Sequence, residues 1–145
     1  MKKILAVILF LVLFTGTALA ADVVQEPAVN GYTAYPHNKD MRVATFTITA
    51  DGSGNVAIFT FEEAQEIYGY YLLSVEIKVA ADDDAITVLL YTNSGATMFS
   101  KTTTAATTGE IHNADDRWPI NSAPKIDITD MTAAKIATVI VTFVR

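Results

Sequence analysis

The chain has 145 residues, of which 51% are hydrophobic, and it carries no cysteine and a formal charge of −6 at pH 7. This length suits one domain with a buried core, and the lack of cysteine excludes disulfides, thiolate metal sites and thiol nucleophiles. The negative charge argues against a protein held to nucleic acid or to anionic lipid by counterion release, so neither partner is expected.

The first 20 residues have the three parts of a secretory signal peptide. Lys2 and Lys3 precede an unbroken apolar run over residues 4–14, and small residues ending in Ala18-Leu19-Ala20 follow. The run is too short to cross a bilayer core of about 30 Å, which takes about 20 residues. We therefore predict a signal peptide at residues 1–20 and a secreted protein without a membrane anchor, with the periplasm or a virion as alternative locations.

Residues 21–41 are predicted to form an extended N-terminal arm ahead of a domain at residues 42–145. Pro27, Asn30-Gly31 and Pro36 are spaced too closely for a regular element. Three apolar or aromatic side chains could attach this arm to the body or to a neighbouring chain: Val29, Tyr32 and Tyr35.

The body consists of short β-branched or alternating segments separated by turn signals. Residues 42–49 and 56–61 flank the turn Asp51-Gly52-Ser53-Gly54-Asn55, which predicts a hairpin. Residues 62–67 have helix-forming composition but suffice for only one or two turns. We expect further strands at 73–79, 86–91, 96–102, 125–129 and 136–144, and a long loop or poorly formed edge strand within 103–122.

Alternation within these segments indicates which face each strand buries. Leu73, Val75, Ile77 and Val79 share one face of their strand. The segments 86–91 and 136–144 are largely apolar on both faces and should be interior strands. After the signal peptide, 39 of 125 residues are β-branched. The predicted fold class is all-β: an antiparallel two-sheet β-sandwich, jelly-roll or immunoglobulin-like, with seven to eight strands.

Two acidic segments have ligands of the kind that calcium prefers. Asp51, Ser53 and Asn55 alternate, with Glu62 eleven residues after Asp51, and Asp82-Asp83-Asp84 form a second group. A strand between Asn55 and Glu62 would carry the distal carboxylate away from the turn. Both segments are therefore interpreted as turns, and no metal site is predicted.

The sequence contains no clear catalytic motif. His112 is close to Asp115 and Asp116, and His37 to Asp40, without a known catalytic or metal-binding spacing. A glycosidase pair drawn from Glu62, Glu63 and Glu66 would need two carboxyl groups across a cleft, which a short polar turn does not indicate. We expect no catalytic residue, no cofactor and no enzymatic activity.

Aromatic residues provide the candidate binding surface. Tyr68, Tyr70 and Tyr71 surround Gly69, and Trp118 lies in a predicted loop. Exposed aromatic rings can stack on sugars or form protein interfaces, so Tyr68, Tyr70 and Trp118 are the predicted contact residues. The alternative is that alternate tyrosines face the core while Trp118 caps one end of the sandwich.

The order of several fragments resembles one known group of proteins. These fragments are TITADGSGNVA at 47–57, YYLLSV at 70–75, NSGATMF at 93–99, DRWPI at 116–120, and the closing pair at 123–128 and 137–141. In this order the chain from residue 44 to residue 144 resembles small virion proteins of tailed phages and prophages, a group that does not ordinarily carry a signal peptide. The resemblance implies a small β-sandwich, attached to capsids or tails, with a structural rather than a catalytic role.

These observations favour a non-enzymatic, exported structural or assembly protein. It would associate with copies of itself or with a larger particle through sheet edges or the N-terminal arm. The alternative is a secreted glycan- or surface-binding β-sandwich module that uses Trp118 and the tyrosines near Gly69.

Overall fold

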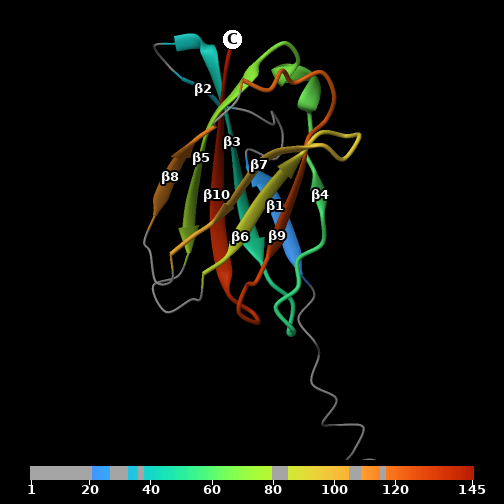
Figure 1. Ribbon diagram of the computed structural model, residues 1–145, viewed down its shortest axis with the longest axis vertical. Helices are drawn as coiled ribbons and strands as arrows, with labels where there is room; N and C mark the ends of the chain where they lie inside the picture. Colours follow the sequence, from blue (N-terminus) through green and yellow to red (C-terminus); the bar gives the residue numbers. More distant parts are fainter. Residues whose placement is uncertain (1–20, 27–32, 36–37, 80–84, 105–108, 115–116) are drawn as a thin grey trace, which may run out of the picture.

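The computed structural model describes residues 21–26, 33–35, 38–79, 85–104, 109–114 and 117–145, so the predicted signal peptide lies outside it. Within these residues ten strands form two antiparallel sheets (Figure 1). Sheet A has the order β1-β3-β10-β5-β8, with β2 also paired to β3, and sheet B has the order β4-β9-β6-β7. The strands are β1 (Asp22–Glu26), β2 (Thr33–Tyr35), β3 (Asn38–Thr49), β4 (Phe59–Thr60), β5 (Tyr71–Val79), β6 (Thr87–Tyr91), β7 (Thr97–Thr102), β8 (Glu110–Asn113), β9 (Lys125–Thr129) and β10 (Ile136–Val144).

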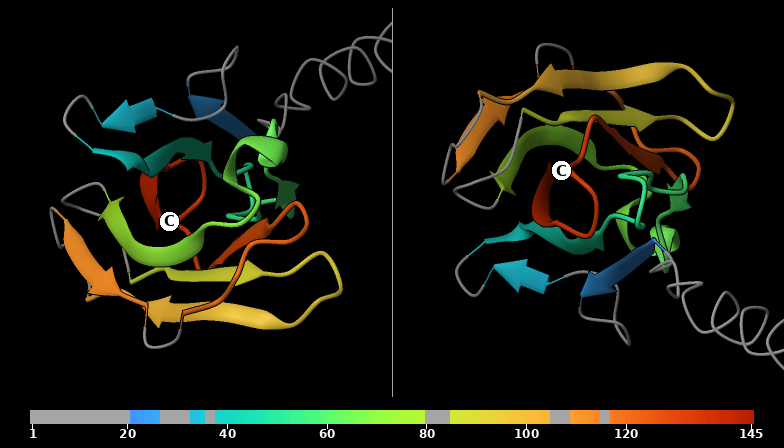
Figure 2. Two further views of the ribbon diagram at one scale, coloured as in Figure 1. Left: turned by 90° about the horizontal axis from the view of Figure 1, so that it is seen from above. Right: turned by 90° about the horizontal axis from the view of Figure 1, so that it is seen from below.

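The two sheets form the layers of a sandwich around one apolar core (Figure 2). Aromatic side chains join the layers: the Phe46 ring of β3 lies 4.5 Å from the Phe61 ring, which follows β4. Phe61 in turn contacts Phe143 of β10, with ring centroids 6.1 Å apart. The predicted all-β, two-sheet antiparallel sandwich is confirmed, with two short strands in the segment expected to be an arm.

The two strands predicted to be interior do lie inside their sheets. β10 pairs with β3 on one side and β5 on the other, and β6 lies between β7 and β9. Ala137, Val139, Val141 and Phe143 of β10 face the core and are almost fully buried. A strand with apolar residues on both faces thus occupies the most enclosed position of its sheet.

The predicted N-terminal arm is incorrect in part, because residues 22–26 form β1 along the edge of β3. Val23 and Gln25 of β1 face inward beside Ile48 and Phe46, and Gln25 is buried. A polar residue at an inward position breaks the apolar alternation by which a strand is recognised. The start of β3 and all of β2 also lie within residues 21–41.

The predicted hairpin is wrong, because β3 and β4 belong to different sheets. Phe59 of β4 pairs with Ile126 of β9, so the chain crosses from sheet A to sheet B after the turn. The Asp51 carbonyl accepts hydrogen bonds from Gly54 N at 3.1 Å and from Ala134 N at 3.0 Å, which ties the turn to the connection before β10. Turn residues reverse the chain without choosing its partner strand. The expected short helix is a single 3₁₀ segment, η1 (Ala64–Ile67).

A β-bulge in β5 changes which side chains it buries. Thr142 of β10 pairs with Ser74 and Phe143 pairs with Leu72, so Leu73 is the extra residue. Leu73 is consequently 40% exposed instead of sharing the buried face of Val75, as the alternation had predicted. The predicted poorly formed edge strand within 103–122 corresponds to β8, which pairs with β5 alone.

Candidate functional site

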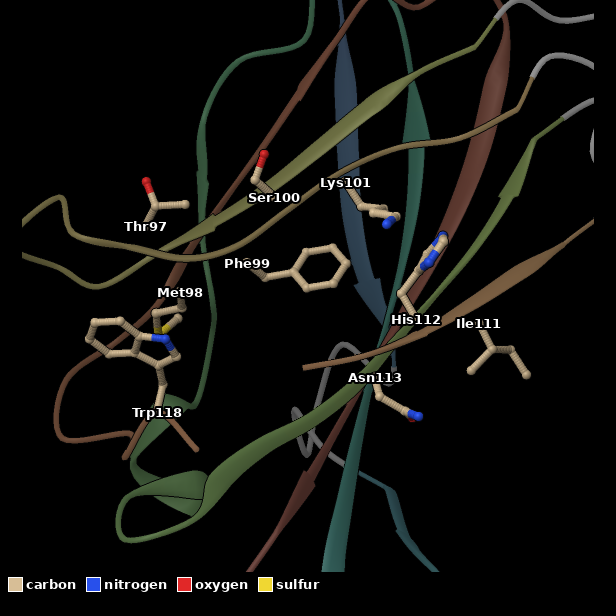
Figure 3. Close-up of a pocket in the computed structure, with 9 residues that line it drawn as sticks. All are labelled: Thr97, Met98, Phe99, Ser100, Lys101, Ile111, His112, Asn113 and Trp118. Carbon is tan, nitrogen blue, oxygen red and sulfur yellow. The ribbon is translucent and has the colours of Figure 1, made fainter. Parts of the chain in front are cut away.

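A cleft of about 540 Å³ opens between β7, the edge of sheet B, and β8, the edge of sheet A. The two edge strands belong to different sheets and do not pair with each other within the described residues. Figure 3 shows the nine lining residues: Thr97, Met98, Phe99, Ser100, Lys101, Ile111, His112, Asn113 and Trp118.

A second bulge positions the apolar part of the cleft. Leu90 of β6 pairs with Phe99 and Tyr91 pairs with Thr97, which leaves Met98 as the extra residue of β7. Met98 and Phe99 are therefore both buried although they are consecutive. Met98 lies beside the Trp118 indole at one end of the cleft (Figure 3).

Trp118 is held by main-chain hydrogen bonds to the start of β5. Leu72 N donates to Trp118 O at 3.3 Å, and Ile120 N donates to Tyr70 O at 2.8 Å. The segment after β8 thereby continues along β5, and the half-buried indole packs against the core while it lines the cleft. Packing against the core restrains the indole at the cleft, which makes it a pre-organised surface.

The other end of the cleft is polar and basic. Lys101 pairs with Val88, and His112 pairs with Val75, so both project from the inner faces of their sheets at the sandwich edge. His112 Nε2 lies 3.0 Å from Glu110 Oε2. Despite this short distance, the buried Nε2 atom makes no hydrogen bond within the described residues. Glu110 Oε1 accepts a hydrogen bond from Thr104 N at 2.7 Å.

The opposite flank of the sandwich is closed. The buried amide of Gln25 on β1 bonds both main-chain groups of Glu62, which follows β4: Glu62 N donates to Gln25 Oε1 at 2.8 Å, and Gln25 Nε2 donates to Glu62 O at 3.2 Å. These bonds join the edges of the two sheets on that side. The cleft lies on the other flank, between β7 and β8.

The structure does not bring the three predicted contact residues together. Trp118 lines the cleft, but Tyr70 is only 5% exposed and lies under the guanidinium groups of Arg42 and Arg145, at 5.5 and 5.9 Å from its ring centroid. Tyr68 is 42% exposed and is not among the lining residues. Sequence reasoning missed Phe99, Lys101 and Asn113, because nothing in the pattern indicates that β7 and β8 flank one cleft.

The turn considered for calcium uses its acidic side chain for main-chain hydrogen bonds. Asp51 Oδ1 accepts from Asn55 N and Ser53 N, both at 2.8 Å, and these bonds hold the pKa of Asp51 below its ordinary value. Within the described residues no group of three or more His, Asp or Glu side chains is placed to hold a metal ion. The other acidic and histidine candidates Asp82-Asp83-Asp84, Asp115, Asp116 and His37 lie outside the described residues.

In the part of the chain that the structure describes, no helix is long and apolar enough to cross a membrane. No family model matches the sequence, and no curated protein matches it.

Several solved structures are similar in fold at low identity. A xylan-binding domain of carbohydrate-binding family 22 from Paenibacillus barcinonensis has 13% identity and a TM-score of 0.39, over 88% of this chain and 96% of that one. A family 22 carbohydrate-binding module from Clostridium thermocellum has 18% identity and a TM-score of 0.37, over 90% and 85%. A chain of infectious bursal disease virus has 9% identity and a TM-score of 0.31, over 88% of this chain and 33% of that one.

These similarities are too distant to carry an argument about a ligand or a role. The three proteins are not phage virion proteins, so the resemblance to that group remains an expectation.

Proposed function

We propose that the protein is a non-enzymatic, glycan-binding β-sandwich module and that the β7/β8 cleft holds the sugar. The observation that carries this proposal is a pre-organised indole, Trp118, within an open cleft whose remaining lining is mostly polar. A sugar ring has an apolar face that stacks on an aromatic ring and a rim of hydroxyl groups that need hydrogen-bond partners. The cleft offers both.

The polar partners are exposed side chains on both edge strands. Thr97 and Ser100 on β7 supply hydroxyl groups, and Asn113 on β8 supplies an amide, so donors and acceptors are available on either side. The volume of about 540 Å³ is within the usual range of about 300–1,000 Å³ for ligand sites. One or two sugar residues would fill it.

The lining residues support binding rather than hydrolysis. Glycoside hydrolysis ordinarily needs a pair of carboxyl groups across the scissile bond. None of the nine residues that line the cleft carries a carboxylate. We therefore propose that the cleft retains a glycan without cleaving it.

The test is a glycan array followed by titration calorimetry of the best glycan. Trp118→Ala should weaken binding about tenfold or more, because it removes the stacking surface. A tenfold loss of affinity corresponds to about 1.4 kcal/mol of binding free energy. Tyr68→Ala, an exposed aromatic residue outside the cleft, should leave the affinity unchanged.

A second pair of variants guards against a folding effect of the Trp118 change. Asn113→Ala should weaken binding, whereas Asn93→Ala, an exposed asparagine in the β6–β7 turn, should not. Thermal unfolding of each variant checks that the fold is intact. If no glycan binds, the proposal is wrong. It is also wrong if Trp118→Ala and Asn113→Ala bind the glycan as tightly as the unchanged protein.

A second candidate is the exported assembly protein, which is favoured by exposed apolar residues on β5 and β8, among them the cleft-lining Ile111. Ile111 on the edge strand β8 is 70% exposed, and the bulged Leu73 on the neighbouring β5 is also exposed. An edge strand with an exposed large apolar residue favours pairing with another chain. Light scattering after size exclusion should then show an oligomer that Ile111→Glu dissociates, while a monomer at all concentrations would exclude self-assembly.

A further inference from the structure

We infer that the glycan held by the cleft is acidic, with its carboxylate or sulfate group at the end formed by Lys101 and His112. This inference rests on the proposed function and specifies its ligand class.

Both basic residues stand at the ends of apolar rows. On the inner face of sheet B, Ile128, Val88 and Lys101 are neighbours across three strands. On the inner face of sheet A, Val141, Val75 and His112 are neighbours in the same way. The four apolar members are buried, so each row changes from hydrophobic to basic at the strand that borders the cleft.

Lys101 takes part in neither of two close charged contacts, Lys78 with Glu76 and His112 with Glu110. Glu110 already accepts a hydrogen bond from Thr104 N and is not a lining residue. Among the described residues that line the cleft, the exposed ammonium group of Lys101 therefore has no carboxylate beside it. An anionic group on the ligand would supply the missing partner of Lys101 and form charge-assisted hydrogen bonds with its ammonium group.

The two ends of the cleft suit two parts of one sugar chain. In Figure 3, Trp118 and Met98 lie together at one end, Lys101 and His112 lie together at the other, and the Phe99 ring is between them. A sugar stacked on the indole would place an anionic substituent, on the same or the adjacent residue, toward the basic end. His112 lines this end of the cleft, and its buried Nε2 atom lies 3.0 Å from Glu110 Oε2.

Inward-pointing charges at a sheet edge can also serve only to prevent strand pairing between chains. That role requires no ligand and gives no preference among sugars. A difference in affinity between acidic and neutral glycans, dependent on Lys101, separates the two explanations.

The experiment compares three purified oligosaccharides by titration calorimetry on the full chain: an oligogalacturonate, which is carboxylated, a sulfated galactan fragment, and a neutral xylo-oligosaccharide. We expect at least one acidic ligand to bind about tenfold more tightly than the neutral one. This preference should shrink as salt is raised from 50 to 500 mM, because salt screens the charge interaction. The acidic ligand that binds more tightly identifies the anionic group.

Lys101→Gln should abolish the preference, because it removes the ammonium group that the acidic ligand would contact. Lys125→Gln, a change of the same charge on β9 outside the cleft, should leave the preference intact. If the neutral oligosaccharide binds as tightly as the acidic ones, and Trp118→Ala removes this binding, the inference is overturned but the proposed function is not. An acid preference that survives Lys101→Gln would also overturn it, and no binding of any sugar would overturn both.

Discussion

At Gly54 an added side chain would conflict with its surroundings. Its φ is +83°, and a Cβ atom there would overlap the main-chain oxygen of Met131. Gly95 has a similar φ of +91° with open space around it. The two positions therefore separate backbone strain from a steric conflict.

Gly95→Ala should cost about 1–2 kcal/mol of unfolding free energy, the usual penalty of a left-handed conformation for a residue with a Cβ atom. Gly54→Ala should cost clearly more, because the Met131 carbonyl must also move. Denaturant unfolding of both variants measures the difference. Equal losses of unfolding free energy in the two variants would mean that the turn at Gly54 moves away from the Met131 carbonyl at no cost.

Asp51 makes a stability contribution that depends on pH. The hydrogen bonds from Asn55 N and Ser53 N lower the pKa of its carboxyl group from the ordinary value of 3.8, because they favour the ionised form in the folded state. The contribution is therefore complete above the unfolded pKa and is lost as pH falls through the lower folded pKa.

Asp51→Asn should accordingly lower the melting temperature near pH 6, and the gap to the unchanged protein should narrow between pH 4 and pH 2. Thermal unfolding followed by circular dichroism over this range measures the gap. Asp22→Asn, which changes an exposed aspartate of β1, is the control for the change in net charge. A gap that stays constant with pH would assign the effect of Asp51 to something other than its ionisation.

At the scale of elements, closure of the β1 flank depends on one buried amide. Gln25 bonds both main-chain groups of Glu62, so Gln25→Ala would leave those groups without this partner. We expect a loss of about 2–3 kcal/mol, in keeping with the cost of unsatisfied buried groups. Gln65→Ala, in the exposed part of η1, should change stability by less than about 0.5 kcal/mol. Similar effects of the two changes would show that the β1 flank does not depend on this amide.

The elements that sequence predicted well are those with a complete local pattern. β10 is apolar on both faces over nine residues, and its central position follows from that alone. β1 was missed because Gln25 takes an inward position, and its stabilisation by Glu62 is a contact between distant residues. The bulges at Leu73 and Met98 were not predictable either, because a bulge depends on the partner strand.

At the scale of the molecule, the sequence indicated a sandwich but not which strands border its open flank. The cleft is formed by edges of two sheets, and strand order is set by long-range pairing that alternation does not encode. Trp118 could be singled out as an unusual aromatic residue in a polar segment. Lys101 could not, because its position at the end of a buried row is visible only once β7 is paired with β6.

The two sheets should unfold together, because the aromatic contacts that join them pass through Phe46. Its ring is fully buried and lies 4.5 Å from Phe61 and 6.0 Å from Phe59. Phe46→Ala should lower the unfolding free energy by about 3–5 kcal/mol, since it removes a large core side chain and leaves a cavity. Ile136→Ala, at an exposed position of β10, should cost much less.

The single tryptophan, Trp118, reports on the cleft, and far-ultraviolet circular dichroism reports on all strands. Because the indole packs against the same core as Phe46, the two signals should change at one denaturant midpoint and shift together in Phe46→Ala. Fluorescence that changes first would mean that the segment holding Trp118 opens before the sandwich. The cleft would then owe its shape to local hydrogen bonds with β5 rather than to the packed core.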